Sequence, residues 1–422
     1  MRRMNNQNKV TGQRSWKANS TMLLLALLFV GILCLSGCGG NSLKSNAKED
    51  EGHTIESTTQ ENNIDDNIDS ESKYISLEII EGRDFSEEVA WVQGFNAIWY
   101  CINTEGKILF ELPEDSKPSD DFDNGIAVID GNKVINISGE IIFDAEKEGC
   151  ILVHNFNRDS YLYDGFVIVS KFIDTFEVTE EQYGILNNDG NWALELTNEY
   201  SEPNYCGSGI FLLTQYNDGE RNQIYFNANT GNTFIHDSDD ELEFSQGYAI
   251  STIYGYPEGI TKLIDSEGKE MFSLNKSCYF GSFSEDLIYL SHGENQGFYD
   301  VSGNMVVDLS EYNIINTPCF TDGYAFLRLN NEQGSYFFTT IDKQGNLQFE
   351  PKNTEANSDI SISDGLIKVN YSEFIDMQGN TVVNFNSGKN YDFKNGILRD
   401  YGLTVFYLNK KGERVLESIN LQ

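Results

Sequence analysis

The strongest constraint on this chain is a short pattern that occurs nine times between residues 102 and 412. An apolar residue is followed by Asp or Asn, two variable residues, Gly and a polar residue, as in Ile264-Asp265 to Gly268-Lys269. The glycines of the nine copies are Gly106, Gly139, Gly190, Gly231, Gly268, Gly303, Gly345, Gly379 and Gly412. Successive glycines lie 33 to 51 residues apart, about 38 on average. A period of this size predicts tandem copies of one supersecondary unit.

The pattern itself predicts a hairpin turn. An Asp or Asn side chain can accept a hydrogen bond from the backbone two residues on, and Gly adopts the positive φ of a tight turn. A calcium loop would need several spaced ligands and a terminal Glu, whereas several copies here carry Asn. We therefore interpret the nine glycines as structural turn residues and expect neither a metal nor a cofactor.

A second recurring pattern precedes each turn. It consists of an aromatic or apolar residue, a few variable residues, Gly and a segment of alternating apolar residues. Phe122 to Val128 and Phe320 to Ala325 are examples. A further short strand follows each turn, such as 140–143. Aromatic residues make up 13% of the chain and there are six prolines, which together indicate a strand-rich, all-β body.

These residues resemble the bacterial WG-repeat family. That family combines a Gly-apolar-Ala strand, a Trp-Gly-aromatic-Ile-Asp strand and a Gly-Lys turn. The most similar copies are Tyr183-Gly184-Ile185-Leu186-Asn187 and Gln296-Gly297-Phe298-Tyr299-Asp300, and the resemblance covers residues 85 to 416. The Trp-Gly pair is mostly missing, with Trp99-Tyr100 as the nearest version. The resemblance implies noncatalytic interaction units.

Nine units of three or four strands suit either a propeller-like ring or an open β-solenoid. An insertion around Phe172 to Glu181 in the third unit favours the ring, because the loops of blades can grow outward. Ten residues follow Gly412, enough for one strand at Val415-Leu416 and little more, so we expect the last unit to lack its outer strand. We also expect the segment Tyr74 to Ile80 to pair with the C-terminal unit and close the ring.

The N-terminus predicts where the protein works. Five basic residues precede an apolar run of about 13 residues, which is too short to span a bilayer. The run ends in Leu35-Ser36-Gly37-Cys38, which resembles a bacterial lipoprotein signal peptide. The resemblance implies that Cys38 is acylated and anchors the protein at the extracytoplasmic face of the cell membrane. The expected domains are a signal peptide (1–37), a lipidated and acidic tether (38–73) and a nine-unit β-repeat domain (74–422).

Charge narrows the class of partner. The formal net charge is −37, and removal of the signal's five basic residues makes it −42. Such a chain repels nucleic acid and anionic headgroups, so we expect no nucleic-acid partner. Cations, neutral glycans and basic proteins remain, and the protein is expected to be monomeric. Five cysteines of the body, Cys101, Cys150, Cys206, Cys278 and Cys319, form no C-x-x-C pair and cannot all pair with one another.

The sequence offers little for catalysis. The four histidines, His53, His154, His236 and His292, have no ligand spacing, and no nucleophile elbow or Walker loop occurs. The densest acidic cluster, Asp237 to Glu243, is typical of a solvated loop. We therefore expect a noncatalytic binding module for a protein or a cell-envelope glycan. The alternative is an exported polysaccharide hydrolase that uses a carboxylate pair at the ring centre.

Overall fold

The computed structural model describes residues 75–155, 159–174, 179–217, 220–236, 241–254, 259–355, 360–370, 373–385, 391–401, 405–416 and 418–421. All described residues belong to a single compact unit, which we call the second unit because it follows the N-terminal residues. The predicted signal peptide, Cys38 and the tether therefore lie outside the described residues. Within those residues, no helix is long and apolar enough to cross a membrane.

The described residues of the second unit form nine antiparallel sheets, which we call blades 1 to 9 in chain order. Blade 1 has the order β37-β1-β2-β3-β4, blade 2 the order β5-β6-β7 and blade 3 the order β12-β11-β10-β8, with β9 also paired to β10. The strands of these three blades are β1 (Ile75–Gly82), β2 (Val89–Gly94), β3 (Trp99–Asn103), β4 (Ile108–Glu111), β5 (Ile126–Ile129), β6 (Lys133–Asn136), β7 (Ile141–Asp144), β8 (Ile151–Leu152), β9 (Leu162–Tyr163), β10 (Phe166–Asp174), β11 (Thr179–Leu186), β12 (Trp192–Thr197) and β37 (Ser418–Leu421).

Blades 4 to 9 each contain four strands that pair in chain order. In blades 4 to 6 these are β13 (Asn204–Gly207), β14 (Ile210–Asn217), β15 (Glu220–Asn227), β16 (Thr233–Phe234), β17 (Phe244–Ser245), β18 (Tyr248–Ile253), β19 (Ile260–Asp265), β20 (Glu270–Leu274), β21 (Tyr279–Phe280), β22 (Leu287–His292), β23 (Asn295–Asp300) and β24 (Met305–Asp308). In blades 7 to 9 they are β25 (Phe320–Thr321), β26 (Tyr324–Asn330), β27 (Tyr336–Asp342), β28 (Lys352–Thr354), β29 (Ser361–Ser363), β30 (Leu366–Lys368), β31 (Glu373–Asp376), β32 (Thr381–Asn384), β33 (Phe393–Lys394), β34 (Ile397–Tyr401), β35 (Val405–Asn409) and β36 (Arg414–Leu416).

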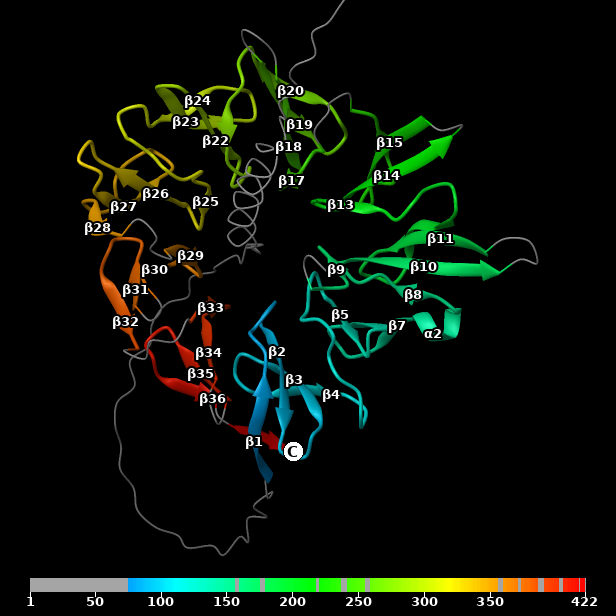
Figure 1. Cartoon of the computed structure of the whole chain (residues 1–422). Coiled ribbons are helices and arrows are strands. Elements are labelled where there is room, and N and C mark those ends of the chain that lie inside the picture. The colour runs from blue at the N-terminus through cyan, green and yellow to red at the C-terminus, as the bar shows by residue number, and fades with distance from the viewer. Residues whose placement is uncertain are drawn as a thin grey trace, which may run out of the picture. The chain divides into compact units, whose positions relative to one another are not determined.

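The nine blades form a closed ring, which confirms the prediction of an all-β propeller and excludes the open solenoid. In Figure 1 the first strands, such as β17 and β25, lie toward the centre of the ring, and the last strands, such as β20 and β28, lie toward the outside. Alternating strand residues face the two neighbouring blades, so the core consists of nine apolar clusters between consecutive blades. An open stack of nine blades would have eight such junctions.

The ninth junction joins the two ends of the domain. Ile79 and Phe85 of blade 1 pack with Val405 and Tyr407 of blade 9 in one buried cluster. The rings of Phe85 and Tyr407 meet edge to face at 5.3 Å. The Tyr407 hydroxyl also donates a hydrogen bond of 2.8 Å to the Arg83 carbonyl.

Strand β1 pairs with the C-terminal strand β37, as predicted, with Ile75 opposite Leu421 and Glu78 opposite Ser418. Farther along, β1 also pairs with β2 of its own blade. The expectation that the last unit lacks its outer strand was wrong. The three residues of β36 form that strand, and the chain then passes into the blade 1 sheet as β37.

Two parts of the ring depart from the regular pattern of short strands: the β10–β11 hairpin and the segment after β7. The insertion in the third unit lengthens a hairpin, because β10 and β11 pair from Val167 and Leu186 out to Asp174 and Thr179. After β7 the chain forms one helical turn, α2 (Ala145–Glu148), where Asp144 caps the N-terminus by accepting from the Lys147 backbone and Gly149 ends the turn in the left-handed region.

Candidate functional site

The strand order gives the ring two faces. In blade 6 the chain runs up β21, turns at Glu285 and Asp286, returns along β22, turns at Gly293, runs up β23, and turns again at Gly303. The first and third turns therefore lie at one end of the blade and the second at the other. We call these ends the turn face and the tip face, and the same order holds in blades 4 to 9.

The predicted glycine turns lie on the turn face. All nine glycines have φ between 76° and 83°. In blade 6, Oδ1 of Asp300 accepts hydrogen bonds from the backbone N–H groups of Ser302 (2.8 Å) and Asn304 (2.9 Å). The same pair of bonds occurs at Asn103, Asn136, Asn187, Asp265, Asp342, Asp376 and Asn409. These side chains build turns, and bonds from the side chain and backbone of Asn304 hold the pKa of Asp300 below its usual value.

Most turn glycines also contact the preceding blade. A Cβ atom at Gly303 would lie 2.9 Å from the Phe272 ring of blade 5, and one at Gly379 would lie 2.8 Å from the Phe349 ring of blade 7. At the ring closure, a Cβ at Gly106 would overlap the Leu416 side chain of blade 9. The glycine is therefore needed both for its backbone conformation and for the apolar residue that packs against it.

A second set of turns lies near the ring centre, directly before β2, β5, β10, β14, β18, β22, β26, β30 and β34. Each contains two successive residues with positive φ, which is type I′ geometry. The nine pairs are Glu87 and Glu88, Asn124 and Gly125, Asp164 and Gly165, Ser208 and Gly209, Gln246 and Gly247, Glu285 and Asp286, Asp322 and Gly323, Asp364 and Gly365, and Asn395 and Gly396. We call these the inner turns. Blades 1 and 6 use acidic residues where the other seven use glycine.

The inner turns bond to one another from blade to blade. The Glu87 carboxylate accepts hydrogen bonds from the backbone of Asn124 (2.5 Å) and Gly125 (2.7 Å) in blade 2. The Glu285 carboxylate likewise accepts from Gly323 of blade 7, at 3.1 Å. Close to the inner turns, four serine hydroxyl groups donate hydrogen bonds to the backbone carbonyl of a phenylalanine in the next blade. These serines are Ser86, Ser245, Ser284 and Ser363. The carboxylates of Glu87 and Glu285 therefore have structural partners.

Asp123 directly precedes the inner turn of blade 2, and its pKa is raised. Its Oδ2 accepts a hydrogen bond of 3.1 Å from the Gly165 backbone of blade 3. Burial raises the pKa of Asp123 to about 6, with smaller contributions from the nearby charges of Asp164 and Glu87. Hydrogen bonds from Gly165 and Asn124 oppose the shift. A carboxyl group of this kind is a candidate for acid chemistry, but its hydrogen bonds also fit a purely structural role.

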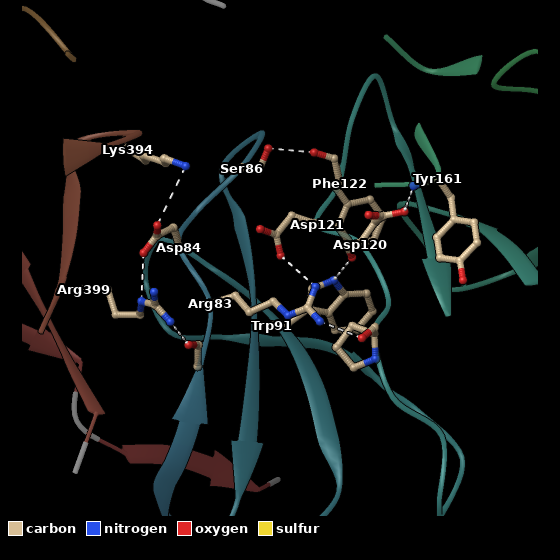
Figure 2. A network of polar contacts seen from close by, with 12 residues as sticks. Arg83, Asp84, Ser86, Trp91, Asp120, Asp121, Phe122, Tyr161, Lys394 and Arg399 are labelled. Atoms are coloured by element: carbon tan, nitrogen blue, oxygen red, sulfur yellow. Dashed lines mark hydrogen bonds and ion pairs between the residues drawn. The ribbon is translucent and has the colours of Figure 1, made fainter. Parts of the chain in front are cut away.

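Ion pairs cross three consecutive blade junctions around the ring closure. Figure 2 shows two of these junctions: Arg399 of blade 9 pairs with Asp84 of blade 1 at 2.8 Å, and Arg83 of blade 1 pairs with Asp121 of blade 2 at 3.4 Å. At the third junction, Lys368 of blade 8 pairs with Asp392 ahead of β33, at 3.0 Å. We call these pairs the closure ion pairs.

Two of the three cations occupy an unusual position. The third residue of the strand that follows each inner turn faces a blade junction and is apolar in seven blades, at Trp91, Val128, Ile168, Leu212, Ile250, Tyr289 and Phe326. In the last two blades it is Lys368 and Arg399. Lys368 is only 3% exposed, so it needs the Asp392 carboxylate beside it. In the sequence, Lys368 and Arg399 each follow two apolar strand residues. This pattern marks both cations but does not identify the carboxylates that pair with them.

The acids next to these cations lie in a partly dehydrated environment. Loss of water raises the pKa of Asp121, and the Arg83 guanidinium opposes the shift. Burial also raises the pKa of Asp120, whose side chain accepts a hydrogen bond of 2.9 Å from the Tyr161 backbone. The Trp91 indole donates to the Asp120 carbonyl at 3.1 Å, so the same segment is bound on two sides (Figure 2).

Exposed aromatic side chains gather on the tip face. Tyr216 lies at the end of β14, Tyr254 directly after β18, and Tyr279 at the start of β21 opposite Ser291. In the described part of the chain, the exposed phenylalanines and tyrosines are Phe95, Phe172, Tyr216, Tyr254, Tyr279 and Phe280, and all six lie at this end of their blades. Sequence reasoning missed this face, because core and exposed aromatics look alike without the register of the strands.

The remaining predicted residues have structural partners or lie outside the described residues. His236 bonds with the Ser251 hydroxyl and His292 with the Ser277 carbonyl, each at 2.8 Å. Of the acidic cluster, residues 237–240 are not described, and Glu241 pairs with Arg221 at 3.8 Å. Among the described residues, no group of three or more His, Cys, Asp or Glu side chains is placed to hold a metal ion.

Cys101, Cys150, Cys206 and Cys278 are free thiols buried in the repeat domain. Burial raises the pKa of the Cys101 and Cys206 thiols to about 12. A thiol with such a pKa is unreactive at neutral pH. These cysteines therefore act as small apolar core residues.

Comparison with known proteins adds little on function. No protein-family model matches the chain, and no curated protein matches it either. Solved structures that are similar include BamB from Moraxella catarrhalis (10% identity, 58% of this chain and 78% of that one, TM-score 0.25). Others are the β-propeller domain of the Trilobed protease from Pyrococcus furiosus (10%, 60% and 92%, 0.26) and the uncharacterized protein lmo1340 from Listeria monocytogenes EGD-e (11%, 74% and 94%, 0.32). At these scores we draw no functional conclusion from the likeness.

Proposed function

We propose that this protein is a noncatalytic binding module, built from degenerate WG repeats and held at the outer face of the cell membrane by a lipid on Cys38. The observation that carries the binding role is the tip face, where aromatic side chains from five blades are exposed to solvent. Tyr279 is 81% exposed and Phe95 is 75% exposed. Large aromatic side chains left in water at one end of a rigid scaffold are typical of interaction surfaces.

The repeat assignment has support in the packing. At Gly184 and Gly297, the two copies most similar to the family motif, an added Cβ would collide with the backbone of the outer strand, at Leu194 and Val307 respectively. Both glycines lie in the third strand of their blade, at β11 and β23. The family's Gly therefore has a physical reason in the copies that retain it.

The turn face offers less support for the hydrolase alternative. The carboxylates of Glu87, Asp123 and Glu285 accept hydrogen bonds from backbone N–H groups of the next blade. Asp84 and Asp121 pair with arginines. A general acid and a nucleophile or base must have room for a substrate between them. We therefore do not pursue hydrolysis as a second function.

The anchoring proposal has a direct test in the host cell. The Cys38→Ala variant should leave the membrane fraction or accumulate as an unprocessed precursor with slower gel mobility, since the cysteine is the predicted lipid acceptor. Cys319→Ala, which changes a cysteine of the repeat domain, is the matched control and should stay in the membrane. If Cys38→Ala partitions and migrates like the unchanged protein, the lipoprotein proposal is wrong.

A further inference from the structure

We propose that the tip face of blades 3 to 6 binds a basic segment of a protein partner, rich in Lys and Arg. This inference rests on the binding role proposed above and adds the chemistry of the partner. The surface consists of Phe172, Tyr216, Tyr254 and Tyr279, one aromatic side chain from each of four consecutive blades. We call these four residues the aromatic arc.

Side-chain contacts join the blades along the aromatic arc. Arg221, which stands opposite Tyr216 in the β14–β15 hairpin, pairs with Glu241 on the connection into blade 5. Two hydrogen bonds, one between His236 and the Ser251 hydroxyl and one between His292 and the Ser277 carbonyl, join other blade connections to β18 and β22. These contacts join the tips of blades 4, 5 and 6, which carry Tyr216, Tyr254 and Tyr279. We call this part of the tip face, together with the neighbouring β10–β11 hairpin that carries Phe172, the strip.

Carboxylates stand beside the aromatic rings. Glu181 lies directly opposite Phe172 in the antiparallel pair of β10 and β11. Glu220 lies opposite Asn217, next to Tyr216, and is exposed. Glu294 forms part of the exposed tip between β22 and β23. Directly opposed residues on one sheet are near enough to contact the same ligand group.

Nearby cations offset these acids only in part. Arg221 is already paired with Glu241 at 3.8 Å, whereas Lys171, which donates a hydrogen bond of 2.8 Å to the Glu148 carbonyl, keeps its positive charge. The strip therefore combines aromatic faces with negative charge. A Lys or Arg side chain suits this combination, because its aliphatic stem packs on a ring, its cation sits over the ring face, and a carboxylate neutralises it.

Charge decides between the candidate partners. The whole chain carries a formal charge of −37, which attracts a basic segment over long distances and repels a second copy of the chain. A neutral glycan can stack on the same rings, but it gains nothing from the carboxylates beside them. The observations therefore favour a basic protein segment.

The test uses the full-length protein and a synthetic 12-residue peptide of alternating Lys and Gly, with a Glu and Gly peptide of equal length as the negative probe. Binding is measured by fluorescence anisotropy at low and at moderate salt. The triple variant Tyr216→Ala, Tyr254→Ala, Tyr279→Ala should weaken binding of the Lys peptide about ten-fold or more. The matched control Ile137→Ala, Met305→Ala, Val306→Ala removes exposed apolar side chains elsewhere and should have little effect.

A second pair of variants separates a local site from general attraction to an acidic protein. Glu181→Gln with Glu220→Gln should weaken binding more than Glu105→Gln with Asp189→Asn, which removes the same charge from the turn face. Equal losses in both pairs, or no loss in the tyrosine triple variant, would overturn the inference. If the tyrosine triple variant instead loses retention on purified envelope polysaccharide at moderate salt, the partner is a glycan and the binding role stands. Loss of neither activity would contradict both proposals.

Discussion

A single glycine in each repeat meets two demands at once. Its φ near 80° forms the hairpin turn, and its missing side chain makes room for an apolar residue of the preceding blade. The two demands separate at Gly231, where φ is 76° but an added Cβ would meet nothing within 4 Å. Gly231 is therefore an internal control, because it has the turn conformation without the contact to the preceding blade.

We expect Gly303→Ala to lower the free energy of unfolding by about 2 kcal/mol or more. About 1 kcal/mol comes from the backbone conformation, and the rest from displacing the Phe272 ring. Gly231→Ala should cost about 1 kcal/mol, because only the backbone conformation is strained. Urea denaturation of the two variants measures the difference. Equal losses would show that the contact with the preceding blade contributes nothing.

Asp123 predicts a specific pH dependence. Its pKa is raised in the folded protein from 3.8 to about 6, so the folded state holds the proton more tightly than the unfolded state. Well below the unfolded-state pKa of 3.8, Asp123 is protonated in both states. As the pH rises from about 4 to about 6, the unfolded state ionises first, and the folded protein loses stability relative to it.

The Asp123→Asn variant should not have this loss. Its melting temperature relative to the unchanged protein should therefore rise between pH 4 and pH 7. Asp300→Asn is the control without pH dependence in this range, because the pKa of Asp300 is lowered in the folded protein and the group is ionised in both states above about pH 4. Its relative melting temperature should be lower by nearly the same amount at pH 4 and pH 7, because the ionised form stabilises the turn. Thermal melts at the two pH values test both variants. A relative melting temperature of Asp123→Asn that is the same at both values would contradict the role assigned to this acid.

The sequence predicts the role of single residues well where local backbone geometry alone determines which residue type can stand there. The nine glycines and the Asp or Asn three or four residues before them form turns because local backbone geometry alone requires it. Lys368 could not be assigned in this way. Its environment depends on Asp392, which comes from the next blade, and on the orientation of two strands across a junction. Contacts between repeats are not encoded in the repeat pattern itself.

At the scale of the element, the short strands at the C-terminus matter most. Strand β36 has three residues and completes blade 9, and the four residues of β37 pair with β1 in the blade 1 sheet. The sequence suggested one strand after Gly412 because the ten remaining residues seemed too few for two. Strands of three and four residues are sufficient here because each joins a sheet that already exists.

Removal of residues 417–422 should destabilise the repeat domain by about 2 to 4 kcal/mol, since it breaks the β1–β37 ladder and leaves β1 as an open edge. Deletion of residues 44–66, which belong to the predicted tether, is the control and should leave the melting temperature unchanged. Circular dichroism of the two truncated proteins provides the comparison. If the C-terminal deletion melts like the control, the ladder does not close the ring.

At the scale of the whole ring, the two faces differ in chemistry. The turn face consists of backbone hydrogen bonds and acids that bind the next blade, so its polar groups serve the fold. The tip face carries the exposed phenylalanines and tyrosines of the described residues and longer hairpins such as β10–β11. Hairpins can differ in length at the tip face without changing the apolar junctions between blades. The tip face can therefore vary for recognition while the turn face retains the repeated turns.

The pairing of Ile75 with Leu421 has a consequence for how this domain can be rebuilt. Because both ends lie in one ladder, the order of the blades along the chain is arbitrary for the folded ring. A circularly permuted gene, with Leu421 joined to Ile75 by a short linker and new termini between Gly293 and Glu294, would retain all nine junctions. It would also move the attachment point of any anchor from blade 1 to the tip of blade 6, and so change which part of the ring faces a membrane.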